Sequence, residues 1–197
     1  MARRSDHSRE ELKQISLAAC RDIVSDGGLS KLKMRKVAER IGYTVGTLYL
    51  VFKNLDDMVE QLNGETLQEL FEHCVGEPPS SNPAQTLKKL ANLFNEFVLF
   101  EKNLWEAVML HRDHVRSPEY AQKVAQVLGL ITAAIAPYYA PQNKALLIHD
   151  TRVLWASLYG IYALHVSNRN AEIESIETMT DSVVDFYAAA KTGKPSK

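Results

Sequence analysis

The sequence predicts an all-α protein of about nine helices. Apolar residues recur at the three- and four-residue spacing of amphipathic helices, from Leu12 near the start to Tyr187 near the end. Helix start and stop signals bound these segments, and no alternating strand pattern or Asn-Gly or Asp-Gly hairpin turn interrupts them. The 197 residues suffice for a substantial core, in one large domain or two small ones.

The first helix is expected over residues 8–26. Ser8 and Glu11 have the spacing of a capping box, in which each side chain satisfies the other residue's backbone N–H. The pair Gly27-Gly28 then ends the helix, because glycine adopts the backbone conformations that close a helix.

The second and third helices, expected over 34–41 and 45–52, are short. Gly42 ends the first of them, and Thr44 is placed to cap the second. Two short helices joined by Gly42-Tyr43-Thr44 have the spacing of a helix-turn-helix unit.

Six longer helices follow. Their expected starts are Asn54, Asn82-Pro83, Asn103, Ser117, residue 142 and residue 174. Those from Asn54, residue 142 and residue 174 are expected to end near residues 75, 167 and 191, and that from Ser117 near Pro137. Residues 77–83, with three prolines, form the clearest break between helices.

The composition describes an ordinary soluble chain. No apolar run reaches the roughly 18 residues of a membrane span, and the charged N-terminus lacks the apolar segment of a secretory signal. Both cysteines, Cys20 and Cys74, lie within apolar helical patterns and are expected to be buried, reduced thiols. We therefore expect a cytoplasmic protein without a membrane partner.

Charge is divided unevenly along the chain. Residues 1–53 carry 11 Lys and Arg against 6 Asp and Glu, whereas residues 54–197 carry 12 against 18. A basic first quarter on an acidic remainder indicates that one end meets a polyanion, although chance clustering gives the same balance.

The third helix carries an unusual outer face. Its buried stripe is expected to be Val45, Leu48, Tyr49 and Phe52, which leaves Gly46, Thr47, Leu50 and Val51 pointing away. That face holds no acid and includes two large apolar residues. Such a surface suits the DNA major groove, where apolar side chains touch thymine methyl groups and phosphates exclude acids. The alternative is that Leu50 and Val51 pack on another part of the same protein.

The residues around this face suit phosphate binding. The hydroxyls of Thr44 and Thr47 can bond a phosphate or a base edge. Lys53 follows the helix and can neutralise a phosphate, and Arg35 and Lys36 begin the second helix, near where a DNA backbone would cross. Gly46 permits a close backbone approach.

Residues 8–62 resemble the DNA-binding domain of the TetR family of transcriptional regulators. The resemblance lies in Gly28, in the run MRKVAERIGYTVGTLYLVFKN at 34–54 and in Asp56-Asp57-Met58. It implies a three-helix DNA-binding domain at 1–54, an effector-binding and dimerisation body at 55–197, and a Tyr49 hydroxyl directed at a phosphate. Two positions depart from the family pattern. Lys33 replaces a capping Ser or Thr but keeps a cation, and Leu55 replaces a phosphate-binding Lys.

The helix expected at 142–167 predicts a homodimer. From Val153 to Leu164 it is apolar nearly all round, which indicates burial on more than one side. A central helix within one monomer is the alternative. If this helix and the last one pair with their copies in a four-helix interface, the contact residues are Arg152, Ala156, Gly160, Ala163, Met179, Val183 and Tyr187.

Effector contacts are expected among large apolar side chains of the body, most of which would otherwise be plain core. These candidates are Phe94, Phe97, Trp105, Met109, Leu128, Ile131, Trp155, Tyr159 and Tyr162. Such a lining suits a small apolar or aromatic molecule.

Other kinds of function find little support in the sequence. His111 and His114 have a metal-ligand spacing, but no third ligand is evident, so we expect no metal and no cofactor. Because the common catalytic motifs are absent, an all-helical enzyme is the least favoured alternative. A further alternative is an adaptor that binds other proteins through its helix-turn-helix. We expect a sequence-specific DNA-binding regulator, a repressor released from a palindromic operator by its effector.

Overall fold

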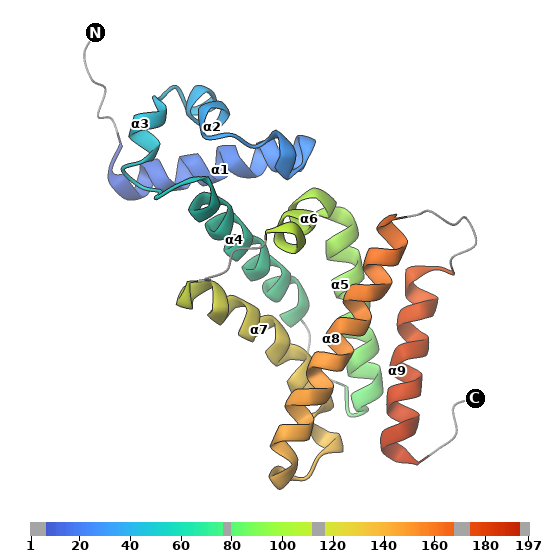
Figure 1. Cartoon of the computed structure of the whole chain (residues 1–197). Helices are drawn as coiled ribbons and strands as arrows, with labels where there is room; N and C mark the ends of the chain where they lie inside the picture. Colours follow the sequence, from blue (N-terminus) through green and yellow to red (C-terminus); the bar gives the residue numbers. More distant parts are fainter. Residues whose placement is uncertain (1–6, 77–79, 112–116, 168–173, 194–197) are drawn as a thin grey trace. The chain divides into compact units, whose positions relative to one another are not determined.

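The computed structural model describes residues 7–76, 80–111, 117–167 and 174–193, and within these residues it contains helices and no strand (Figure 1). The helices are α1 (Arg9–Gly27), α2 (Met34–Ile41), α3 (Val45–Leu48), α4 (Leu55–Val75), α5 (Pro83–Phe100), α6 (Lys102–Leu110), α7 (Pro118–Ile135), α8 (Lys144–Ser167) and α9 (Ile176–Thr192). Short 3₁₀ helices occupy Leu29–Lys31, Ala136–Tyr138 and Pro141–Asn143. None of the described helices is long and apolar enough to cross a membrane.

The helix termini agree closely with the sequence signals. Ser8 and Glu11 form both bonds of the capping box, and Gly28 closes α1 with φ 74°. Gly42 closes α2 in the left-handed region, also with φ 74°. Asn54 accepts a hydrogen bond from the Asp57 N–H at the start of α4, over a distance of 2.8 Å.

One helix begins earlier than expected. Glu101 is the N-cap of α6, so Asn103 lies inside the helix instead of starting it. The Asn103 side chain donates a hydrogen bond of 2.7 Å to the Ser25 carbonyl instead. This bond joins residues 78 positions apart, and local capping patterns carry no information about such a contact.

The chain divides into two compact units, residues 1–69 with 100–123 and residues 70–99 with 124–197. The first unit has a core built from α1, α2, the α3 region, the start of α4, and α6. Leu48, Phe52 and Met58 are fully buried in it, together with Leu104 of α6. Helix α6 therefore packs with the N-terminal helices, while the functional division at residue 54 stays a prediction.

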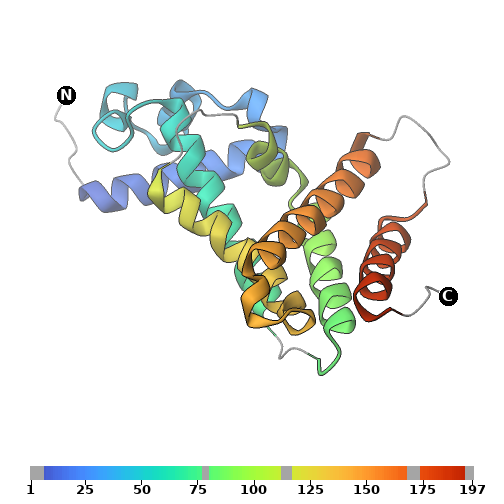
Figure 2. The same cartoon turned by 60° about the horizontal axis from the view of Figure 1, so that its bottom comes forward.

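The second unit contains the end of α4, most of α7, and helices α5, α8 and α9. Helices α8 and α9 run antiparallel and pack against each other (Figure 1). Helix α5 lies beside α8 in both views (Figures 1 and 2), where Phe94 and Trp155 meet edge to face with ring centroids 5.5 Å apart. Buried Asn95 of α5 donates to Thr180 of α9 over 3.1 Å.

A polar network joins α8, α9 and the segment between α7 and α8. Asp150 accepts hydrogen bonds from the Tyr139 hydroxyl and from Lys191, the latter at 2.6 Å. The Tyr139 and Tyr187 hydroxyls lie 2.6 Å apart. Burial would raise the pKa of Asp150, but the hydrogen bonds from Lys191 and Tyr139 outweigh it and hold that pKa below its usual value. Burial and the bond to Asp150 raise the pKa of Tyr139 to about 12.

The Lys191→Met variant should be less stable than the parent at pH 7 by about 2 kcal/mol, because a mostly buried carboxylate loses its cation. The Asp150 and Lys191 side chains are only 15% and 22% exposed. Because the folded-state pKa of Asp150 is lowered, its ionised form stabilises the protein above the unfolded-state pKa of about 3.9, and this contribution is lost as the pH falls through the folded-state pKa.

Denaturant unfolding at pH 7 and at pH 3.5 measures this effect. The difference between parent and Lys191→Met should shrink at the lower pH. Lys144→Met, which removes an exposed lysine from the first turn of α8, is the matched control. Equal stability of the two variants at pH 7 would contradict the assigned role of Lys191.

Candidate nucleic-acid interface and ligand cavity

The turn between α2 and α3 is held by side-chain and backbone hydrogen bonds. The Thr44 hydroxyl oxygen accepts from the Thr47 N–H over 3.3 Å, and the two threonine hydroxyls lie 3.0 Å apart. The Tyr43 N–H donates to the Ala38 carbonyl over 2.9 Å, and the Tyr43 hydroxyl lies 2.7 Å from His7 Nδ1. These bonds define the course of the backbone that enters α3.

Helix α3 is shorter than expected. Regular helix ends at Leu48, and residues 49–51 form a turn whose bonds include Val51 N–H to Leu48 carbonyl at 3.0 Å. The expected range of 45–52 was too long, since Gly46 and the β-branched residues Val45, Thr47 and Val51 are weak helix formers. The Phe52 N–H bonds the Leu48 carbonyl at 2.9 Å, which closes this turn.

The exposed face of this segment is narrower than expected. Tyr49 and Leu50 are 54% and 59% exposed, and Gly46 is exposed beside them. Val51 packs against the core of the first unit, so its assignment to the outer face was wrong. Tyr49 lies outside the buried stripe to which the spacing assigned it, because the turn after Leu48 departs from helical periodicity.

Two further residues of the expected interface are only partly accessible. Val45 is half-buried and packs against the same core as Val51, and Thr47 is half-buried. Both remain at the surface of the α3 segment. Thr44, Gly46, Tyr49 and Leu50 offer the more open contacts there.

Basic residues flank the α3 segment in the sequence, and no acid occurs between residues 40 and 54. Lys33 is the exposed N-cap of α2 and, as expected, makes no side-chain cap. Arg35 is exposed and pairs with Glu39 at 2.8 Å, which offsets part of its charge. The exposed Lys53 is placed by its backbone N–H, which donates to Asp57 over 2.8 Å.

Arg9 is a basic residue of this region that the sequence analysis missed. Its guanidinium donates to the Leu50 carbonyl, with Nε at 2.7 Å. The contact closes the turn after α3 and places a cation at its edge. The two residues are 41 positions apart, so no local pattern could have indicated it.

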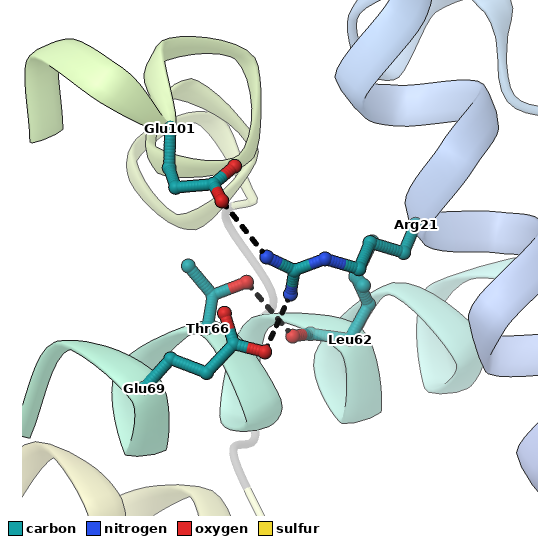
Figure 3. Close-up of polar contacts among 5 residues, drawn as sticks. All are labelled: Arg21, Leu62, Thr66, Glu69 and Glu101. Carbon is teal, nitrogen blue, oxygen red and sulfur yellow. Dashed lines mark hydrogen bonds and ion pairs between the residues drawn. The ribbon is translucent and has the colours of Figure 1, made fainter. Parts of the chain in front are cut away.

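Arg21 ties three elements of the first unit together (Figure 3). From α1, its guanidinium reaches Glu69 of α4 at 2.7 Å and Glu101, the N-cap of α6, at 3.1 Å. Beside it, the Thr66 hydroxyl donates to the Leu62 carbonyl over 3.1 Å. The arginine fork thus fixes the position of α1 against α4 and α6, although such partly exposed pairs contribute only about 1 kcal/mol each.

A cavity of about 340 Å³ lies in the second unit, between the end of α4 and helices α5 and α7. A smaller void of about 20 Å³ adjoins it and shares Cys74, Leu90 and Leu130 with it. The Cys74 thiol is buried, which raises its pKa to about 11. An open groove of about 380 Å³ in the first unit is lined by acids and lysines, so it suits an apolar molecule less well.

Three of the expected effector residues, Phe94, Ile131 and Trp155, line the smaller void. Trp105 and Met109 lie in the first unit, where Trp105 is buried. The other candidates belong to the second unit. There Phe97 is buried against His73, Tyr162 is buried, Leu128 is half-buried and Tyr159 is exposed.

The outer face of α8 is exposed and mostly apolar. It includes Arg152 and Ala156, with Gly160 and Ala163 half-buried beside them. Val153 and Tyr159 are exposed large apolar residues of the same face. On α9, Met179 and Val183 are half-buried and Phe186 is 65% exposed, whereas the Tyr187 hydroxyl is engaged within the chain.

Metal binding gains no support from the described residues, among which no cluster of three potential ligands occurs. Of the expected histidine pair, His114 lies outside the described part of the chain. Cys20 and Cys74 are free and buried, as the sequence predicts.

Two family models match the chain. One, described as the tetracyclin repressor-like C-terminal domain, matches residues 87–187, and the other, described as bacterial regulatory proteins of the tetR family, matches residues 17–62. The chain is therefore a DNA-binding transcriptional regulator of the helix-turn-helix class. More particularly, it belongs to the TetR family, whose members are regulators and not enzymes. No curated protein matches the chain in sequence.

Solved structures share the fold along most of their length. A TetR transcriptional regulator from Rhodococcus sp. RHA1 is 14% identical with a TM-score of 0.69, over 91% of this chain and 97% of that one. The multidrug binding protein EbrR, complexed with imidazole, is 23% identical with a TM-score of 0.60, over 93% and 95% of the two chains. BioQ, with its double-stranded DNA operator, is 15% identical with a TM-score of 0.62, over 87% and 97%.

Proposed function

We propose that the protein is a homodimeric repressor that binds a near-palindromic DNA operator and leaves it when a small apolar or aromatic effector binds. The observation that carries the proposal is the exposed face of residues 45–50, which presents Tyr49 and Leu50 in a stretch of sequence that holds no acid. The similarity to BioQ, whose crystal structure contains its double-stranded DNA operator, supports a DNA partner. The similarity to the ligand-bound EbrR supports an effector.

Each exposed group of the interface has a proposed role. Leu50 and Thr47 contact base edges and confer sequence preference, with Val45 at the margin and Gly46 admitting the DNA backbone. Phosphates are bound by the groups whose hydrogen bonds or charges carry no sequence information, namely Lys33, Arg35, Thr44, Tyr49 and Lys53.

A dimer places two such surfaces on one operator. The outer face of α8 and the exposed Phe186 of α9 present more apolar side chains than a surface in contact with water alone usually carries. Pairing α8 and α9 with their copies buries both. The two α3 segments of a dimer would then enter successive major grooves, about one helical turn apart.

Effector control requires two states of the dimer with different affinities for the effector. Helix α4 carries the chain from the first compact unit into the second and contributes Cys74 and Val75 to the cavity. An effector acts by binding more tightly to the state in which the two α3 segments are spaced wrongly for the operator. The operator affinity can fall at most by the ratio of the effector's affinities for the two states.

The proposal is tested by selecting bound duplexes from a random DNA pool and titrating the enriched site at several salt concentrations. An enriched inverted repeat with a steep salt dependence is expected from a dimer that contacts several phosphates. Weak binding without enrichment would count against a groove-binding role for Leu50, and would favour an adaptor that contacts protein through this surface.

Lys53→Ala should weaken binding to every duplex by a similar factor of about 10, because a phosphate contact does not depend on sequence. The slope of log affinity against log salt concentration should become shallower by about 1 for each Lys53 that is replaced in the complex. Fluorescence anisotropy on the selected site and on a scrambled duplex measures both effects. Lys102→Ala, on an exposed lysine of α6, is the control. An unchanged slope in Lys53→Ala would show that Lys53 does not bind a phosphate.

A further inference from the structure

The exposed turn after α3 is held from the start of α1. Arg9 donates to the Leu50 carbonyl from Nε, over 2.7 Å, and from one terminal nitrogen of its guanidinium. We infer that Arg9 is a positioning residue for base recognition: by fixing the backbone of Leu50, it determines how sharply the protein discriminates among operators. The inference rests on the proposed function in taking Leu50 as a residue that contacts base edges.

Leu50 depends on its backbone for its position. Its side chain is 59% exposed, so packing within the first unit holds it only slightly. The Leu50 N–H donates to the Thr47 carbonyl over 3.1 Å, and the turn then closes on the Leu48 carbonyl, which accepts from two of the residues that follow it. A carbonyl at the end of a helical segment needs a donor from outside that segment. Arg9 is this donor for Leu50, and a bond from a charged donor is stronger than one from a neutral group.

The start of α1, which carries this contact, is itself well fixed. Arg9 is the first residue of the helix, directly after Ser8, whose capping box has both of its bonds. One residue before the cap, His7 Nδ1 lies 2.7 Å from the Tyr43 hydroxyl. This short segment therefore contacts the chain on both sides of α3, at the turn before it and at the turn after it.

A direct phosphate contact is the other role open to an exposed arginine. A guanidinium binds a phosphate best through two parallel N–H bonds from one of its edges. In Arg9 the edge that carries Nε is occupied by the Leu50 carbonyl. The geometry therefore favours support of the protein backbone, and a phosphate contact becomes an outcome that the experiment distinguishes.

The test compares operator preference in full-length proteins: the parent, Arg9→Met, Leu50→Ala and the double variant. Fluorescence anisotropy is measured on the selected operator and on each of its single-base variants. Arg9→Met should lower discrimination by about threefold or more at the base pairs where Leu50→Ala lowers it. Added to Leu50→Ala, it should change discrimination there by less than about twofold, because two residues that act through one contact are not additive.

Two further variants separate positioning from charge. Lys102→Met, which removes an exposed lysine of α6, should keep the parental preference. Arg9→Lys keeps the charge but replaces two donor nitrogens with one ammonium group, so it should keep the salt dependence and restore only part of the discrimination. Arg9 and Leu50 are both exposed, so every variant should keep the parental helix content by circular dichroism.

Three results would overturn the inference. A uniform loss of affinity in Arg9→Met, with full discrimination and a shallower salt dependence, would make Arg9 a phosphate ligand. Full discrimination with parental affinity would show that the contact with the Leu50 carbonyl has no part in recognition. Additive losses in the double variant would show that Arg9 does not act through Leu50.

The single variants also separate this inference from the proposed function. If Leu50→Ala changes the preference and Arg9→Met does not, the positioning role fails and the base contact of Leu50 stands. If Leu50→Ala leaves the preference unchanged, the proposed base contact fails and the positioning role fails with it.

Discussion

Leu48→Ala should cost about 3 kcal/mol of unfolding free energy and remove operator binding almost completely. Leu48 is fully buried, and it belongs to the core that also holds Phe52 and Met58. Truncating a buried leucine leaves a cavity as well as losing apolar burial. Since α3 has only four residues, the packing of Leu48 and the bonds to its carbonyl are the main forces that fix its position.

Leu50→Ala is the matched control, since it makes the same chemical change two residues later on a side chain that is 59% exposed. Its unfolding free energy should stay within about 0.5 kcal/mol of the parent, and its preference among related operators should change. Denaturant unfolding and anisotropy on a panel of single-base operator variants measure the two properties. Destabilisation of Leu50→Ala as large as that of Leu48→Ala would show that Leu50 is packed and unavailable to DNA.

The helical fold could be predicted because its signals are local. Capping at Ser8 and Asn54 and the glycine terminators Gly28 and Gly42 depend on residues within one or two turns of each other. The expected starts therefore agree with the structure at α1, α2 and α4. At α6 the signal was misleading, since Asn103 bonds the distant Ser25 carbonyl and Glu101 takes the cap position.

The exposed surface of the α3 segment could be predicted only in part. The absence of acids and the exposure of Leu50 follow from the sequence and its spacing, but a helical wheel assumes that periodicity continues. The turn after Leu48 breaks it, so that Val51 packs inward and Tyr49 turns outward. The contact of Arg9 with the Leu50 carbonyl depends on tertiary packing and has no local signal.

The cavity was the least predictable feature. The sequence candidates were large apolar residues, most of them aromatic, but the larger cavity is lined by small and aliphatic residues and by polar side chains, which are common everywhere in helices. Which of these residues face an open space depends on how α5 and α7 pack together. The pattern of apolar residues along each helix would be the same whether the space between the helices were filled by side chains or left empty.

If α8 forms the proposed dimer interface, Ala156→Arg should give a monomer and lower operator affinity by about 100-fold or more. Ala156 lies at the centre of the exposed face of α8, with Val153 and Tyr159 at its sides. An arginine there would face its own copy across a two-fold axis, so the interface would hold two unpaired charges. A monomer binds a single half-site. It loses the high effective concentration at the other half-site that a linked second DNA-binding domain provides.

His165→Arg is the control, because His165 is exposed on the same helix but lies about half a turn away from Ala156 around its axis. Sedimentation velocity at micromolar concentration should give a monomer for Ala156→Arg and a dimer for His165→Arg. Circular dichroism should show unchanged helix content in both, since each substitution is at an exposed site of a helix that arginine favours. A dimeric Ala156→Arg protein with parental operator affinity would contradict the assignment of the α8 face to the dimer interface. The two DNA-binding domains would then be joined through another surface.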